Sequence, residues 1–157
     1  AQIVDQQGAR WQPVDSLFRG PGISTIDSTR QIVTQIRFPR PDLQTGTAWR
    51  RVGRRPALVL PILNCAVKLE IRPQGNLATI ALGPVAPRPQ RMGKAEEYLS
   101  TQPITDETIQ QAANLAQEEA NPRSSVMRAS RSYRLNVIPT LVSEALHQAA
   151  QRATTKT

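Results

Sequence analysis

The sequence predicts an α+β fold, in which a mainly antiparallel sheet carries helices on one face. Three observations lead to this prediction. Residues 1–103 show the alternating apolar pattern and the turn residues of short strands, whereas residues 105–157 show the apolar spacing of helices. Of the 157 residues, 39% are hydrophobic and 20% charged, as in a globular protein. Strands that precede helices along a chain are typical of an α+β sandwich.

The start of the chain predicts a hairpin, a loop and a further strand. The segment "AQIVDQQGARWQPV" indicates a strand, a turn near Gly8 and a short second strand that Pro13 limits to an edge or an end. The segment "FRGPGIST" contains Gly-Pro-Gly and predicts a loop. The alternating residues of "QIVTQIRF" predict a strand, which Pro39 ends.

Three more strands are expected before the helices begin. They lie in "TAWRRVG", "ILNCAVKLEI" and "NLATIALGPV", and a tight turn at "RPQGN" joins the last two into an antiparallel hairpin. We expect residues from about Ile32 to Val85 to form one sheet. The asparagine in "ILNCAV" is polar within an apolar strand, so we expect Asn64 and Cys65 to be buried. We also expect the Asn64 amide to bond the loop of residues 50–60.

The second half of the sequence predicts helices. Thr105 suits an N-cap, acidic residues follow it, and an apolar stripe runs to Ala120 before Asn121 and Pro122 end the helix. A last helix is expected over residues 138–152, with Pro139 kinking it or marking its first turn. A shorter helix is expected around "MGKAEEYLST". The two longer helices should pack on the same face of the sheet.

Charge and composition restrict the partners and the location of the protein. The net charge is +8 and the sequence pI is about 11.0, so we expect an anionic partner such as a nucleic acid, a lipid, a phosphorylated cofactor or an acidic protein. The single cysteine excludes an internal disulfide. No secretory leader opens the sequence, and the longest apolar run, residues 56–67, is too short to span a bilayer. We therefore expect a cytoplasmic protein without membrane insertion.

Most side chains with catalytic potential have ordinary explanations. His147 has no second histidine or cysteine at metal-ligand spacing, which predicts a surface or helix-end residue and no metal site. No nucleophile elbow, dinucleotide fingerprint or P-loop occurs, and we expect no catalytic residue in this chain. The pairs Glu96-Glu97 and Glu118-Glu119 lie in predicted helices and indicate solvated faces.

Four arginines stand immediately before the longest apolar run: Arg50, Arg51, Arg54 and Arg55. They are consistent with a solvated basic turn, since arginine is common on surfaces. They are also consistent with a turn around Gly53 that directs Arg50 and Arg54 toward an anion or a polar ring. In that arrangement residues 56–60 provide an apolar wall beside the ring.

The order of motifs along nearly the whole chain resembles the C-terminal part of the flavin-binding subunit of the xanthine dehydrogenase and carbon monoxide dehydrogenase family, the molybdenum hydroxylases. The most specific pieces are "RRVGRRPA" with "ILNCAV", and "IALGPVAPRPQR". The first is similar to the family pattern basic-x-x-Gly-x-Arg-x-Ala followed by Val-Asn-x-Ala. The second is similar to Leu-Gly-x-Val-Ala-x-x-Pro-x-Arg. Arg50 stands where a lysine is common, and Pro61 and Pro139 depart from the pattern.

The resemblance implies a domain division and a cofactor. Residues 1–22 would be the tail of the second FAD-binding domain, and residues 23–157 the C-terminal α+β domain of the flavoprotein. The family loop that borders the flavin matches Arg50 to Leu58, which gives five cofactor-binding candidates: Arg50, Gly53, Arg54, Ala57 and Leu58. Positive charge beside the ring would stabilise the anionic reduced flavin and so tune its potential.

The resemblance also implies partners and a limit on what the chain does alone. The phosphate-binding segments of the family are expected upstream, so the chain would be a fragment or one piece of a split subunit, inactive by itself and without retained FAD. Its partners would be the remainder of the flavin subunit and the iron–sulfur and molybdenum subunits. In the complete oxidoreductase, electrons pass from a molybdenum centre through iron–sulfur clusters to FAD and on to an acceptor.

Two alternatives remain open at the level of sequence. A basic nucleic-acid-binding module would account for the net charge, but aromatic residues are 4% of the chain, the basic residues are dispersed, and no zinc or RNP-like motif occurs. We therefore expect no nucleic-acid partner. A purely structural interaction module is also consistent with the sequence.

Overall fold

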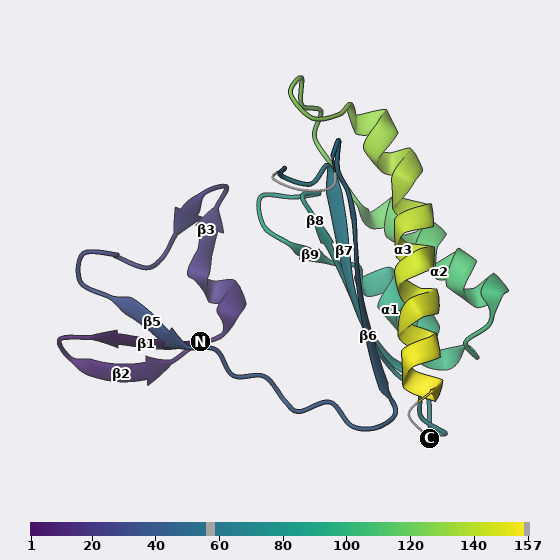
Figure 1. Cartoon of the computed structure of the whole chain (residues 1–157), viewed down its shortest axis with the longest axis horizontal. Coiled ribbons are helices and arrows are strands. Elements are labelled where there is room, and N and C mark those ends of the chain that lie inside the picture. The colour runs from purple at the N-terminus through teal and green to yellow at the C-terminus, as the bar shows by residue number, and fades with distance from the viewer. Residues whose placement is uncertain (56–58, 156–157) are drawn as a thin grey trace. The chain divides into compact units, whose positions relative to one another are not determined.

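The computed structural model describes residues 1–55 and 59–155. Its contacts divide the chain into two compact units, Ala1–Arg40 and Pro41–Thr157, whose elements are labelled in Figure 1. The domain boundary predicted after Gly22 lies inside the first unit, and residues 23–40 share that unit with the strands that precede them.

The first unit contains two small antiparallel sheets. The larger has the strand order β2-β1-β5 and the smaller pairs β3 with β4. The bounds are β1 Gln2–Asp5, β2 Gly8–Trp11, β3 Phe18–Gly20, β4 Ile23–Ser24 and β5 Ile32–Gln35, with a 3-10 helix at Val14–Leu17. Strand β2 lies at an edge and ends before Pro13, as predicted. The prediction that the main sheet begins at Ile32 is wrong, because β5 pairs with β1.

The second unit contains a four-stranded antiparallel sheet with the order β6-β7-β8-β9. Its strands are β6 Thr45–Val52, β7 Leu63–Glu70, β8 Leu77–Gly83 and β9 Gln90–Arg91. The predicted hairpin between β7 and β8 is confirmed, and Gly75 in its turn has a φ of 122°, a conformation that glycine adopts readily.

Three helices cover one face of this sheet, as Figure 1 shows. They are α1 Gly93–Thr101, α2 Asp106–Glu119 and α3 Arg131–Thr154. Helix α3 packs on β6 and β7, α1 packs on β8, and α2 contacts both other helices. The core between the layers includes Leu63, Leu69, Ile80, Leu99 and Leu146, none of which is exposed to solvent. The predicted α+β architecture with helices on one face is confirmed.

Glycine allows β6 and α3 to lie very close together. Gly46 on β6 is buried against the backbone of α3, and a Cβ atom at this position would overlap the carbonyl group of Ala149. No other residue type fits without moving the strand away from the helix.

Helix α3 begins seven residues earlier than predicted and continues through Pro139. A proline inside a helix has no N–H for the carbonyl one turn before it, which here belongs to Leu135. The side-chain Nε2 of Gln117 on α2 donates to that carbonyl oxygen at 2.9 Å. A contact between helices thus satisfies a carbonyl that the helix itself leaves without a partner. Ser130 caps the start of α3 by accepting from the Tyr133 N–H.

The capped helix α2 matches its prediction closely, since Thr105 and Thr108 form a reciprocal capping box at its start.

The expectation that the paired glutamates are solvated is wrong for one member of each pair. Glu119 accepts from the N–H groups of Gly93 and Lys94 and so caps α1. Glu96 accepts from the Ile80 N–H and pairs with Arg91.

Candidate functional site

The predicted arginine segment lies at the end of β6 and in the loop between β6 and β7. The pleat directs neighbouring residues of a strand to opposite faces of the sheet. Arg50 is paired with Cys65, which is fully buried on the helix-covered face, whereas Arg51 is paired with Asn64 on the open face. The two adjacent arginines therefore lie on opposite faces of the sheet.

Arg50 is bound to helix α3. Its Nη1 donates to Oε1 of Gln148 at 2.5 Å, and its Nε lies 3.8 Å from Oε2 of Glu144, one helical turn earlier. The Arg50 side chain is 35% exposed and that of Glu144 is 60% exposed, so the ion pair is a partly solvated one with a small energetic contribution. The position of Arg50 indicates a tie between strand and helix.

Gly53 and Arg54 follow in the loop and are both exposed. A Cβ atom at Gly53 would lie 3.2 Å from Cγ1 of Val59, so a side chain here would require a small shift of Val59. Nη2 of Arg54 donates to the main-chain oxygen of Arg128 at 3.5 Å, which brings the loop to the segment before α3. The other two candidates, Ala57 and Leu58, lie outside the described residues.

The prediction for "ILNCAV" is half correct. Cys65 is fully buried, and its burial raises the pKa of the thiol to about 12, so it is an unreactive core residue. Asn64 is only half-buried, and no hydrogen bond links its side chain to the loop within residues 1–55 and 59–155. Its amide instead faces Gly83 on β8 from the open side of the sheet.

The loops at this end of the sheet line an open cavity of about 320 Å³. Leu60 and Pro61 come from the loop after β6, prolines 84, 87 and 89 come from the segment after β8, and Arg128 precedes α3. Arg88 and Arg128 are the charged residues of the described lining, which contains no carboxylate. The cavity therefore combines an apolar wall with positive charge.

The residues around this cavity include functional candidates that the sequence reasoning did not single out. Arg134, in the first turn of α3, is 3% exposed, and its Nη1 donates to the Pro84 carbonyl at 3.2 Å. The signal that could have found this group was the density of arginines in "NPRSSVMRASRSYR", directly before a helical pattern. Counted over the whole sequence, the basic residues are dispersed from Arg10 to Lys156, which hides this local density.

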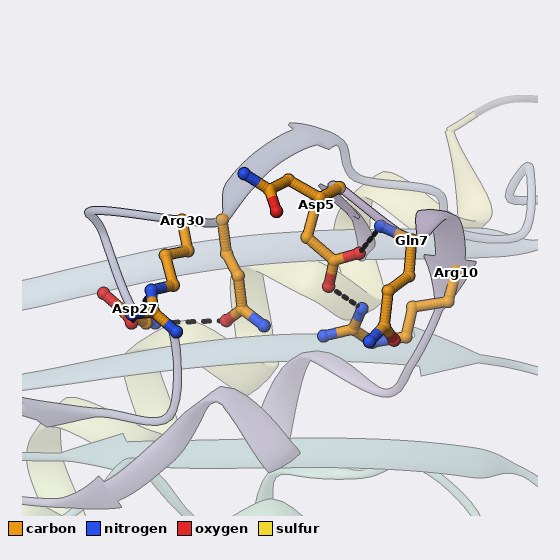
Figure 2. A pocket seen from close by; sticks show the side chains of 7 residues that line it. Asp5, Gln7, Arg10, Asp27 and Arg30 are labelled. Atoms are coloured by element: carbon orange, nitrogen blue, oxygen red, sulfur yellow. Dashed lines mark hydrogen bonds and ion pairs between the residues drawn. The ribbon is translucent and has the colours of Figure 1, made fainter.

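A second cavity, of about 480 Å³, lies within the first unit (Figure 2). Asp5 there pairs with Arg10 and accepts from the Gln7 N–H, and these contacts, the arginine first, lower the pKa of the Asp5 carboxyl. Asp27 lies 3.9 Å from Arg30 on the other side. Each acid has a basic partner, so this polar cavity shows no uncompensated charge.

The other expectations for sites can be compared with the described part of the chain. Nδ1 of His147 lies 3.7 Å from Oδ1 of Asp106, and its side chain is 41% exposed, which confirms a surface position but within α3 rather than at its end. Residues 1–55 and 59–155 contain no group of three or more potential metal-ligating side chains. Among the same residues, no helix has both the length and the apolar character needed to cross a bilayer.

Comparison with known proteins places the chain in a family context. Residues 48–149 match the CO dehydrogenase flavoprotein C-terminal domain family. The xanthine dehydrogenase FAD-binding subunit of Escherichia coli O157:H7 is 27% identical over 154 residues, which are 97% of this chain and 52% of the relative. The chain thus spans about half the length of that relative.

Solved structures share the fold. A carbon monoxide dehydrogenase from Hydrogenophaga pseudoflava, lacking the Mo-pyranopterin moiety of its molybdenum cofactor, gives a TM-score of 0.85 at 26% identity, over 96% of this chain and 52% of that one. Quinoline 2-oxidoreductase from Pseudomonas putida 86 gives a TM-score of 0.80 at 24% identity, over 97% of this chain and 52% of that one. At that identity the second likeness bears on the fold alone.

Proposed function

The chain belongs to the CO dehydrogenase flavoprotein C-terminal domain family, and we propose from this membership that it forms the C-terminal part of the FAD-binding subunit of a molybdenum hydroxylase. The observation that carries the proposal is the match over residues 48–149, which includes every candidate cofactor-binding residue. In this role the chain contributes part of the surroundings of the flavin. FAD, when bound, supplies the electron-transfer chemistry.

The residues of the loop after β6 fit a flat, partly anionic ring. Gly53 leaves room for close approach, Arg54 offers an exposed guanidinium, and Leu60, which is 66% exposed, offers an apolar surface. We propose that Gly53, Arg54, Ala57 and Leu58 border the flavin. Arg50 acts indirectly: its contacts with Gln148 and Glu144 on α3 hold the start of this loop in place.

The proposal also includes a position for the first unit and for partners. Residues 1–22 would be the tail of an FAD-binding domain, and residues 23–40 lie in the same compact unit as that tail. Iron–sulfur and molybdenum subunits would deliver electrons to the flavin, in the cytoplasm. The nucleic-acid alternative is not favoured, because the family match accounts for most of the chain without it.

One test concerns the isolated chain. We expect the purified 157-residue chain to be colourless and to hold no stoichiometric FAD, because its few loop contacts must offset the entropy of fixing a large flexible ligand. The visible spectrum measures this directly. A yellow chain with one FAD per molecule would place the main cofactor site within these residues and contradict the proposal.

A sharper test uses the complete flavin subunit. Replacing Arg54 with Gln should leave FAD bound and lower the midpoint potential, because a charge that stabilises the reduced ring is removed. Arg50→Ala should lower it less, since Arg50 already shares its charge with Glu144. Arg152→Gln removes the same charge at the far end of α3 and serves as the control. A potential that Arg54→Gln does not move would show that Arg54 faces away from the flavin.

A further inference from the structure

Positive charge is concentrated where helix α3 begins. Arg123 and Arg128 lie in the segment before the helix, and Arg131 and Arg134 lie in its first turn, which contains no acidic residue. The N-terminal end of a helix is itself the positive end of its dipole. Among residues 1–55 and 59–155, none of the ion pairs involves any of these four arginines. The charge at this end of α3 is therefore uncompensated by the described part of the chain.

Arg134 is the buried member of the group. Its Nη1 donates to the Pro84 carbonyl, but its Nε atom is buried and has no hydrogen-bond partner among the described residues. Burial and then the like charges of Arg128 and Arg123 lower the pKa of this guanidinium. A buried cation beside other cations is unfavourable unless an anion accompanies it.

The cavity described above lies next to this buried charge. Pro84, whose carbonyl accepts from Arg134, lines the cavity together with Arg88 and Arg128. The cavity volume of about 320 Å³ is at the lower end of the range of about 300–1,000 Å³ that is typical of small-molecule sites. A small anion suits a space of this volume, and Arg134 lies behind the lining, to which its bond with the Pro84 carbonyl connects it.

We propose that this cavity binds a small phosphate-type oxyanion through the guanidinium groups of Arg88 and Arg128. Arginine suits this chemistry because its planar fork donates two parallel hydrogen bonds to phosphate oxygens. Arg134 acts as a positioning residue, a fixed charge behind the site that offsets the negative charge of the anion. The proposal goes beyond the flavin assignment. The cavity shares Leu60 with the loop after β6, and Arg54 of that loop contacts the main chain of Arg128, but the guanidinium groups concerned come from the segments after β8 and before α3. The titration with pyrophosphate therefore tests this site separately from the flavin experiments.

The test is calorimetric titration of the 157-residue chain with pyrophosphate at fixed ionic strength. One equivalent should bind. Arg88→Gln and Arg128→Gln should each weaken the affinity about tenfold or more, since each removes charge-assisted hydrogen bonds. Arg152→Gln is the matched control: it carries the same change of charge on the same helix, 18 residues beyond Arg134 and so about 27 Å away along the axis. It should bind as the wild type does.

Arg134 is tested by two variants, with circular dichroism and urea unfolding to confirm that each is folded. Arg134→Lys keeps the charge and should bind pyrophosphate within about threefold of the wild type, whereas Arg134→Gln should bind about tenfold or more weakly. If Arg134→Gln does not fold, the test depends on Arg134→Lys alone. An Arg134→Lys variant that folds but does not bind pyrophosphate would contradict the positioning role.

Three results would overturn the proposal. The first is no binding of pyrophosphate by the wild type. The second is equal weakening by Arg128→Gln and Arg152→Gln, which would indicate general attraction to a basic protein. The third is tighter binding of a hexaglutamate peptide than of pyrophosphate, with the same dependence on Arg128, which would assign the surface to an acidic protein partner.

Discussion

The units Ala1–Arg40 and Pro41–Thr157 use their hydrophobic residues differently. In the first unit the buried hydrophobic residues are Ala1 and Ile3, while large apolar side chains such as Trp11, Phe18, Ile32 and Phe38 are exposed. In the second unit, strands β6 to β8 and the three helices enclose a continuous core. A sheet of three short strands without a buried face is marginally stable alone. The comparison indicates that most of the stability resides in the second unit, whereas the first leaves large apolar side chains exposed.

The chain carries its own probes for testing this difference. It has two tryptophans, Trp11 in the first unit and Trp49 in the second. A Trp11→Phe background leaves fluorescence that follows the second unit, and a Trp49→Phe background follows the first. The predictions below use urea unfolding read through these probes, from the largest expected effect to the smallest.

Gly46→Ala should have the largest effect and lower the free energy of unfolding by more than about 4 kcal/mol. The new Cβ atom would overlap the Ala149 carbonyl and force β6 away from α3. The matched variant in the first unit is Gly22→Ala. Gly22 has a φ of 70° and open space around it, so only backbone strain of about 1 kcal/mol is expected. Similar losses for the two variants would remove the distinction between the units.

Leu69→Ala should cost about 2 to 5 kcal/mol, because the side chain is fully buried and its removal leaves a cavity. Ile32→Ala in the first unit removes a side chain that is 62% exposed, and the free energy of unfolding should change by no more than about 0.5 kcal/mol. If Ile32→Ala were as costly as Leu69→Ala, the first unit would have a core of its own.

The burial of Cys65 should make the stability of the second unit fall at alkaline pH. Burial raises the pKa of the Cys65 thiol in the folded protein to about 12, whereas the unfolded value is near 9. The contribution of the buried, protonated thiol to the free energy of unfolding is therefore fully present below pH 9 and is lost as the pH rises toward 12. At pH 10.5 this contribution should have fallen by about 2 kcal/mol. Cys65→Ala lacks the group, so its free energy of unfolding should decline less between pH 8 and 10.5. Equal declines would mean that the thiol ionises in the folded protein.

Gln117→Ala should cost about 1 to 2 kcal/mol, because it leaves the Leu135 carbonyl without its partner opposite Pro139. Gln110→Ala on the same helix removes only an exposed contact with Asn114 and is the control. In a Pro139→Ala background the helix regains its own N–H donor, so the cost of Gln117→Ala should shrink. An unchanged cost there would show that the contact acts through packing alone.

Removal of the first unit should have the smallest effect. A polypeptide of residues 41–157 should retain the free energy of unfolding that Trp49 reports in the whole chain, within about 0.5 kcal/mol. The reason is that the core of the second unit is complete without residues 1–40. A large loss of stability would show that the second unit depends on the first.

Sequence reasoning predicted the local structure well and the long-range pairing less well. The strand of residues 32–35 is present, but it pairs with β1 rather than joining the sheet of the second unit. Alternation of apolar residues identifies a strand and its two faces, whereas the identity of its neighbour depends on the closure of distant segments. For the same reason the predicted boundary after Gly22 differs from the contact boundary after Arg40.

The candidate site shows the same division. The segment from Arg50 to Leu58 was found from its charge and its resemblance to a family, and the family match includes it. The contacts of Arg50 with Gln148 and Glu144 depend on the register of β6 and on the way α3 crosses it, which no local pattern encodes. Whether this segment borders a flavin stays a prediction.

The sequence by itself determined the α+β class, the β7–β8 hairpin, the capped helix α2 and the family, because each depends on periodicity, capping residues or motifs within a short segment. Only the tertiary structure decided that α3 continues through Pro139 and that Arg134 is buried beside a cavity. Pro139 favours a helix end in a local reading, and an arginine favours the surface. In the fold, Gln117 satisfies the Leu135 carbonyl and the packing of α3 encloses Arg134, and both effects come from residues distant in the chain.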